Sequence, residues 1–353
     1  MRNRIDLVII GIAAALNGCS KHSVSPSESS GATEVQVLAD FAQNVALANY
    51  EDLLTKTTVL AQASGQLRLS TTDSNLAIAQ SAWRSARTAW EQAEGFLFGP
   101  IEDYNYDPTV DTWPLSRTEM DSLLASGKAL TVSDVDALPY SLKGFHAIEY
   151  ILFGAGSAAY LSARDLDYLG ALTQSLQNTA NALFNSWDPN QAGNFSAIFV
   201  GAGPGNERYP TRRDAFLALV EAMVDICDEV ADEKMQDPLI KQDSTLDESP
   251  FAHNSTTDFR NNITGVENAY LGKYFVDGHG LNELVAEGNL SLDEEIQSEL
   301  STAINSFDAI GPNFESAIYV RQAQVRATQA AIRALRETLE SKLVLYLQTT
   351  ITD

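Results

Sequence analysis

Apolar residues recur at steps of three and four along most of this chain, and this helical period constrains its fold more than any other feature. One stripe begins after Asp73, which we expect to act as its N-cap, and another lies near the C-terminus. The first consists of Leu76, Ala79, Trp83, Ala86, Trp90, Ala93 and Leu97, and the second of Ile318, Val325, Ile332, Leu335, Leu339, Leu343 and Tyr346. No series of alternating apolar and polar residues indicates a β-sheet. The sequence therefore predicts an all-α protein built from helical bundles.

Two irregular stretches interrupt the helical pattern. The first runs from Gly99-Pro100 to Trp113-Pro114 and is aromatic, rich in proline and long for a connector, as loops that carry or cover a site tend to be. The second, residues 188–210, divides the chain into halves of domain size. We therefore expect an N-terminal bundle over residues 34–200 and a C-terminal bundle over residues 201–353. Further helices are expected near residues 35–60, 133–153, 164–184 and 211–234.

The first residues have the pattern of a targeting segment. Arg2 and Arg4 precede the short apolar run Leu7–Leu16, and small residues then lead to Cys19. The run has about half of the ~20 apolar residues that a membrane-spanning helix needs. This pattern resembles a bacterial lipoprotein signal, which predicts a signal peptide over residues 1–18, a lipid on Cys19 and a flexible Ser-rich tether over residues 19–33. The location expected is the cell envelope, at the outer membrane of a Gram-negative bacterium. The alternative is an ordinary secretory signal with an incidental cysteine.

The charge balance limits the kinds of partner. The chain has 23 Lys plus Arg against 47 Asp plus Glu, a formal net charge of −24, and no basic run outside its first residues. Nucleic acid is therefore excluded as a partner, because binding to phosphates depends on clustered Lys and Arg. Small cations and the membrane lipid at Cys19 are compatible with this charge. If Cys19 is lipidated, Cys227 is the remaining thiol, and its place on an apolar stripe predicts a buried packing residue.

The sequence contains few candidates for catalytic or metal-binding residues. The four histidines are His22, His146, His253 and His279. They form neither a zincin motif nor the Glu-x-x-His pairs of di-iron bundles. His146 and Glu149 remain, three residues apart on one helical face and close enough to bind one cation or each other. Gly144 costs about 1 kcal/mol inside a helix, which suggests a close approach of another backbone or a ligand. By spacing alone a structural pair remains the alternative.

The segment Gly144–Gly154 (GFHAIEYILFG) resembles the Gly-x-His-x-x-Glu motif of the imelysin family, which was founded on an insulin-cleaving membrane peptidase and includes iron-regulated lipoproteins. Other stretches agree in order and character, so that the likeness covers the chain from about Val35 onward. They are Trp83–Arg87 with Trp90 and Glu94, Phe96–Pro100, Trp113–Leu115, Phe251–Ser255 and Asp258–Asn262.

The resemblance implies two related helical bundles, the product of an internal duplication, with a cleft between them. It implies that His146 and Glu149 face this cleft as metal ligands, with Glu94 as a third candidate and Trp113 and Gly144 lining the cleft. Gly265–Tyr270 echoes the glycine start of the motif, with Glu267 in the place of His146.

Three functions are compatible with these residues. The first is binding of iron or zinc, as the ion or a small metal complex, by His146, Glu149 and one more carboxylate in iron uptake. The second is a metallopeptidase in which His146 and Glu149 act, although catalysis needs about three protein ligands and a general base. The third is an adaptor that contacts an outer-membrane transporter or a haem-like ligand through the aromatic loop. The sequence leaves open whether the protein is an enzyme.

Overall fold

The structure is a computed structural model that describes residues 33–351. The predicted signal peptide, the lipid on Cys19 and the tether up to residue 32 lie outside the described residues. In the described range no helix is long and apolar enough to cross a membrane.

The described part of the chain is all-α, as predicted, and its β-pairing is limited to an isolated bridge between Lys273 and Asp277. The helices before residue 190 are α1 (Glu34–Asp40), α2 (Ala48–Leu69), α3 (Asp73–Ala93), α4 (Pro100–Asp103), α5 (Tyr106–Asp111), α6 (Arg117–Ala125), α7 (Val132–Asp136), α8 (Gly144–Gly154) and α9 (Ala163–Trp187). Those after it are α10 (Phe195–Val200), α11 (Arg212–Asp228), α12 (Gln236–Lys241), α13 (Ser255–Leu271), α14 (Leu281–Ile310), α15 (Phe314–Val320), α16 (Gln322–Thr338) and α17 (Val344–Thr350).

Several of the helices pass through a π-helical turn without ending. These turns are η1 (Phe41–Leu47) between α1 and α2, η5 (Glu229–Lys234) after α11, and η7 (Leu339–Leu343) between α16 and α17. Wide turns of this kind are rare and are often found at functional sites. The helices predicted near residues 35–60 and 211–234 therefore exist, and each contains such a turn.

The local sequence explains where α3 begins and what it buries. Thr72, not Asp73, is the N-cap, because the Thr72 side chain accepts the Asn75 N–H, whereas the Asp73 carboxylate accepts the Ala158 N–H at 2.8 Å. The predicted stripe is buried: Trp83 and Trp90 are both 0% exposed. Their burial contributes strongly to the stability of the core, because burying a large aromatic ring removes much apolar surface from water.

Two predicted elements differ in the structure. The helix expected over residues 133–153 is divided into α7, a 3-10 turn at Tyr140–Leu142 and α8, because Pro139 cannot continue a helix and Gly144 has a φ of +76°. The connector expected after Gly99 contains two short helices, α4 and α5, the first of which has Pro100 at its first position.

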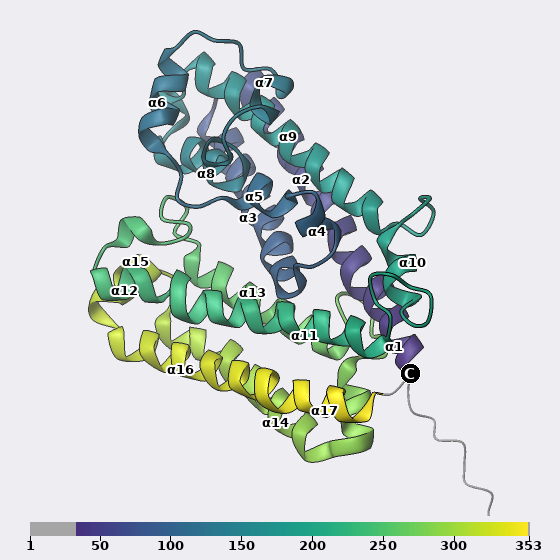
Figure 1. The fold of residues 1–353 in the computed structure, drawn as a ribbon. Coiled ribbons are helices and arrows are strands. Elements are labelled where there is room, and N and C mark those ends of the chain that lie inside the picture. Colours follow the sequence, from purple (N-terminus) through teal and green to yellow (C-terminus); the bar gives the residue numbers. More distant parts are fainter. Residues whose placement is uncertain (1–32, 352–353) are drawn as a thin grey trace, which may run out of the picture. The chain divides into compact units, whose positions relative to one another are not determined.

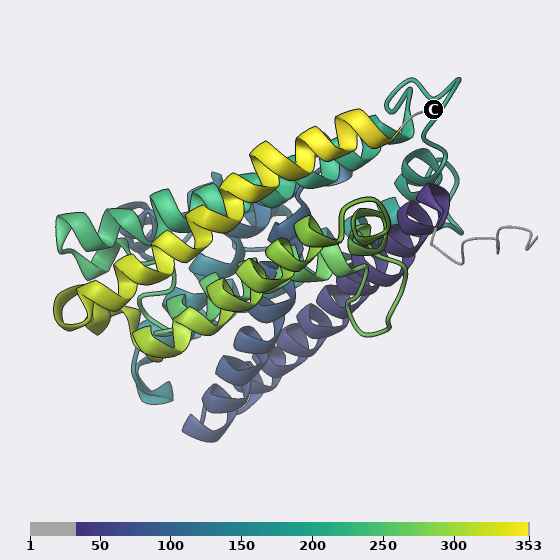
Figure 2. The ribbon, with the colours of Figure 1, turned by 90° about the horizontal axis from the view of Figure 1, so that it is seen from below.

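The helices form two groups. In Figure 1, α2, α3, α8 and α9 lie in one group, and α11, α13, α14 and α16 in the other, with α13 packed against both α3 and α14. Figure 2 shows the long helices running lengthwise side by side. Contacts join residues 33–351 into one compact unit, and the division at residue 200 stays a prediction.

Two glycines allow the two groups to approach closely at α3 and α13. A Cβ atom on Gly95 would lie 2.4 Å from the carbonyl carbon of Gly265, and one on Gly265 would lie 2.3 Å from the Gln92 carbonyl oxygen. Side chains at these positions would separate the helices. Gly265 thus lies inside a helix, whereas Gly144 begins one, so the two glycines do not occupy equivalent positions.

Candidate metal centre

Charged side chains from five segments converge where the two groups of helices meet. They come from α3, the turn that follows it, α5, α8 and the segment from residue 234 to α13. We call them the central cluster, which consists of Arg87, Glu91, Glu94, Asp111, His146, Glu149, Lys234, Glu248 and Asp258. The side chain of each is at most 12% exposed.

Gly144 brings the motif helix against α5. A Cβ atom at this position would lie 2.2 Å from the Val110 carbonyl oxygen, so only glycine allows the start of α8 to contact the end of α5. Asp111 follows Val110 directly, and its Oδ1 lies 3.1 Å from His146 Nε2. The close approach that Gly144 suggested is therefore to a backbone, and it places Asp111 beside the motif histidine.

His146 lies between two carboxylates and is 1% exposed. Its Nδ1 lies 3.4 Å from Glu149 Oε2, while its Nε2 has no hydrogen-bond alignment with Asp111 despite the short distance. Burial opposes the charged imidazolium, but the Asp111 carboxylate outweighs it and raises the pKa of His146 to about 9. The ring of Trp113 packs against the imidazole at a centroid distance of 4.8 Å.

Glu149 faces away from the rest of the cluster. Its Oε1 accepts the backbone N–H groups of Phe251 at 2.9 Å and Ala252 at 2.8 Å. Its other oxygen lies near His146 Nδ1. The predicted ligand Glu149 is thus placed to orient His146 and to hold the segment before α13, as carboxylates behind metal-bound histidines commonly do.

Arg87 is the central cation of the cluster and is completely buried. Its Nε lies 2.5 Å from Glu91 Oε1, its Nη2 donates to Glu248 Oε1 at 2.8 Å, and its Nη1 donates to Asp111. Burial would raise the pKa of Asp111, yet the guanidinium and His146 hold that pKa well below its usual range. Asp111 is therefore ionised, and it pairs with both Arg87 and His146.

Glu94 is buried and paired. Lys234 Nζ lies 2.8 Å from Glu94 Oε2 and 3.1 Å from Glu248 Oε1. The indole N–H of Trp90 donates to Glu94 Oε1 at 3.1 Å and to Asp111 Oδ2 at 2.6 Å. Trp90 is thus a core residue, as predicted, and also a hydrogen-bond donor to the site.

Two overlapping sets of side chains could hold a metal ion. One set is Asp111, His146 and Glu248, and the other is Glu91, Glu94, Asp111 and Glu248; in each set the candidate ligand atoms lie within 4.8 Å of one another. Of the predicted ligands, His146 belongs to the first set, Glu94 to the second and Glu149 to neither. Carboxylate and imidazole ligands suit iron and zinc.

The central cluster carries an excess of negative charge. It contains six carboxylates but two permanent cations, Arg87 and Lys234, and one histidine. Burial raises the pKa of Glu91 and of Glu94, and it raises the pKa of Asp258 to about 7. A buried excess of this kind is costly unless protons or a cation neutralise it.

A pocket of about 340 Å³ leads to the cluster. Its lining includes Glu94, Asp111, Glu248 and the half-buried Trp113. Four more acids, Asp107, Glu229, Glu233 and Asp237, lie around it with the single cation Lys234. Such a field attracts cations.

The sequence gives only indirect signals for the cluster residues that the sequence analysis did not predict. Asp111 lies in the long aromatic connector, two residues before Trp113, and Glu248 lies just before the family-like segment that begins at Phe251. Arg87 stands in the Trp83–Arg87 segment but has no local partner other than Glu91. Lys234 had no signal beyond the end of a predicted helix.

Other predicted residues lie outside the cluster. His253 and His279 occupy loops, where each lies near a glutamate, Glu315 and Glu283 respectively. Cys227 is buried, and burial raises the pKa of its thiol to about 12, so it is a packing residue as predicted.

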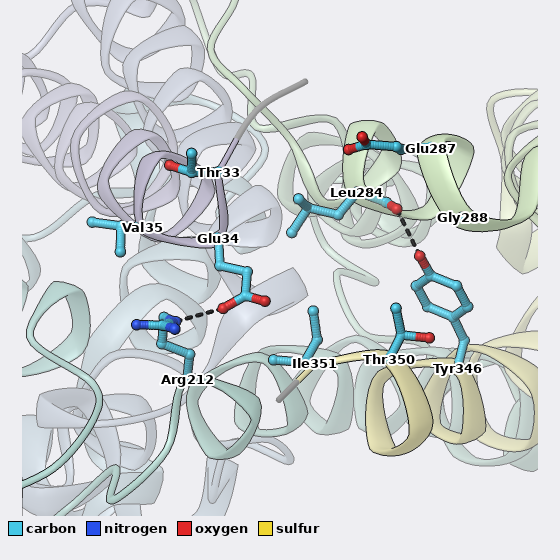
Figure 3. Close-up of a pocket in the computed structure, with 10 residues that line it drawn as sticks. All are labelled: Thr33, Glu34, Val35, Arg212, Leu284, Glu287, Gly288, Tyr346, Thr350 and Ile351. Atoms are coloured by element: carbon cyan, nitrogen blue, oxygen red, sulfur yellow. Dashed lines mark hydrogen bonds and ion pairs between the residues drawn. The ribbon is translucent and has the colours of Figure 1, made fainter. Parts of the chain in front are cut away.

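A separate pocket of about 470 Å³ lies where the starts of α1, α11 and α14 meet α17 (Figure 3). Glu34 accepts from Arg212 at 2.5 Å, and the Tyr346 hydroxyl donates to the Leu284 carbonyl at 2.7 Å. None of the predicted site residues lines it, so it is not the candidate centre.

Comparisons with known proteins agree with this fold. The family model described as Imelysin matches residues 46–342. Iron-regulated protein A of Synechococcus elongatus is 29% identical over 350 residues, which cover 97% of this chain and 93% of that protein.

Two crystal structures have the same fold. One, described as an iron-regulated protein A precursor from Parabacteroides distasonis, has a TM-score of 0.81 and 24% identity, and the match covers 92% of this chain and 97% of the other. An imelysin-like protein from Psychrobacter arcticum has a TM-score of 0.75 and 13% identity over 91% of this chain and 97% of its own.

Proposed function

Because this chain belongs to the imelysin family, and because its motif histidine lies in a buried acidic cluster, we propose that it binds a metal ion or a small metal complex in iron uptake. The name of its relative, iron-regulated protein A, supports the link to iron. We further propose that a lipid on Cys19 anchors it to the outer membrane of a bacterial envelope, where a transporter would receive the metal.

The observation that carries the metal proposal is the convergence of three ligand-type side chains around a carboxylate oxygen that has no partner. Glu248 Oε2 is buried and has no hydrogen bond, and the partner of His146 Nε2 is another candidate ligand, Asp111, at 3.1 Å. Buried polar atoms are nearly always paired, so an unpaired carboxylate oxygen in this ligand set supports a bound ion. Asp111, His146 and Glu248 would hold it, Glu149 would orient His146, and the acidic pocket would supply access.

The chemistry of the ligand set also allows the second candidate, a metallopeptidase. A catalytic metal needs three protein ligands and an open position, and this set has three beside a pocket. Glu94 would be the general base, because burial raises its pKa and it lines that pocket. Bound metal would supply Lewis acidity.

The test is calorimetric titration of the metal-free chain beginning at Val24 with Fe(II), Fe(III) and Zn(II). We expect His146→Gln and Glu248→Gln to weaken binding of the best metal by at least ~100-fold. Glu149→Gln should weaken it ~10- to 100-fold, as losses behind the ligands do. His253→Gln, which changes an exposed histidine outside the cluster, is the matched control and should bind like the wild type.

Unchanged affinity in both His146→Gln and Glu248→Gln, with helical content retained, would refute the site. Hydrolysis of a protein substrate by the metal-loaded chain, abolished by Glu94→Gln with metal binding retained, would favour the peptidase over simple binding.

A further inference from the structure

A second pocket adjoins the acidic pocket at Trp113 and Pro114. Its volume is about 420 Å³, and it shares these two residues with the acidic pocket. Leu115, Pro250 and Phe251 supply the rest of its apolar wall. We call it the aromatic pocket. Pockets of this size and character commonly hold small organic molecules.

A guanidinium group without an acidic partner lines this pocket. Arg117, the first residue of α6, lies over the rings of Tyr150 and Phe251 at 5.6 and 5.7 Å from their centroids. In the part of the chain that the structure describes, this side chain makes neither a hydrogen bond nor an ion pair.

Burial weakens the negative charge of the acid in the lining. It raises the pKa of Glu315, whose Oε1 lies 3.3 Å from Nδ1 of the exposed His253, another residue of the lining. Ser244 and Thr245 add neutral hydroxyl groups. The acidic pocket, by contrast, has seven carboxylates and one lysine in its lining and would repel an anion.

The aromatic pocket borders the motif. The Phe251 N–H donates to Glu149 Oε1, and the Trp113 ring packs against His146. Phe251 is further held by Tyr150, whose ring meets it edge-on at 5.2 Å. Its walls are therefore positioned by residues that also hold the His146–Glu149 pair.

We infer that the aromatic pocket is a binding site for a small aromatic carboxylate, whose ring contacts Trp113 and Phe251 and whose carboxylate pairs with Arg117. Arginine recognises carboxylates through two parallel hydrogen bonds, and aromatic side chains favour a flat apolar ring. This inference does not depend on metal binding, because Arg117 lies outside the central cluster.

The test uses benzoate and its neutral isostere benzamide as probes of the full chain. Trp113 provides the signal, since it is half-buried and lines the pocket, whereas Trp83, Trp90 and Trp187 are fully buried. We expect benzoate to change tryptophan fluorescence in a saturable way, with an affinity at least ~10-fold higher than that of benzamide.

In Arg117→Gln the preference for benzoate over benzamide should disappear. Benzoate should bind at least ~10-fold more weakly than to the wild type, whereas the affinity for benzamide should be unchanged. Lys128→Gln, which removes an exposed cation after the same helix, is the matched control and should behave like the wild type. Equal affinity for the two probes, unchanged benzoate binding in Arg117→Gln, or no saturable signal with either probe would each overturn the inference. Arg117 is exposed, so its replacement leaves the core intact.

Discussion

Replacing Arg87 by methionine tests whether the central cluster depends on one buried cation. The guanidinium is completely buried and contacts Glu91, Asp111 and Glu248 directly, with Asp258 at 3.7 Å. Methionine has a similar length and fills much of the same space, so the change removes mainly the charge and its hydrogen bonds.

The size of the destabilisation depends on which partners the carboxylates keep when Arg87 is removed. Breaking a buried ion pair by removing one partner costs about 3–5 kcal/mol, because the other charge stays buried without compensation. Glu248 keeps Lys234, Asp111 keeps Trp90 and His146, and Glu91 keeps Asn262, so the losses do not simply add. We expect Arg87→Met to lower the free energy of unfolding by about 3–5 kcal/mol at pH 7.

The destabilisation caused by Arg87→Met should be smaller at acidic pH. Arg87 and His146 hold the pKa of Asp111 below its value of about 4 in the unfolded chain. The resulting stability is present above that value and is lost as the pH falls through the folded-state pKa. The difference between variant and wild type is therefore smaller at pH 3 than at pH 7.

Urea unfolding followed by circular dichroism at both pH values measures this. Arg68→Met is the control, because Arg68 forms an exposed ion pair with Asp167 and should cost less than about 1 kcal/mol. If Arg87→Met differs from Arg68→Met by less than about 1 kcal/mol at pH 7, the central role assigned to Arg87 is incorrect.

Three further predictions follow from single residues. Zinc affinity should rise about tenfold per pH unit between pH 7 and about 9. Burial opposes the charged form of His146, but Asp111 outweighs it and raises the pKa to about 9, so a proton must leave before the metal binds. An affinity that does not change with pH would contradict this. Gly265→Ala should lower the free energy of unfolding in urea by about 1–3 kcal/mol or more, because its Cβ would lie 2.3 Å from a backbone oxygen. The control is Gly170→Ala, whose Cβ would have no atom within 4 Å and which should be neutral or slightly stabilising. Burial raises the pKa of Asp247 to about 8, so its ionisation removes stability as the pH rises from about 4 to about 8; Asp247→Asn should match the wild type at pH 4 and unfold at a higher urea concentration at pH 8.

Local features of the fold were readable from the sequence. The three-and-four period of the Trp83 and Trp90 stripe predicted a helix and its buried face, because both depend only on neighbours along the chain. The break before Gly144 was missed, although Pro139 was a local signal for it.

The candidate site divides in the same way. His146 and Glu149 were found because they share one turn of one helix, and the close approach at Gly144 was expected from the cost of glycine. That the approaching backbone is Val110, which brings Asp111 to His146, depends on how α5 packs against α8.

The sequence by itself determined the all-α class, the buried stripes and the motif pair, since each arises from residues within a few positions of one another. Only the tertiary structure decided that Glu149 accepts the backbone N–H of Phe251. It also decided that Glu248, which follows His146 by 102 residues in the sequence, lies beside Asp111 and His146 in the candidate ligand set. The physical reason is that a side chain's neighbours across a packed core are set by helix–helix contacts, which no local period encodes.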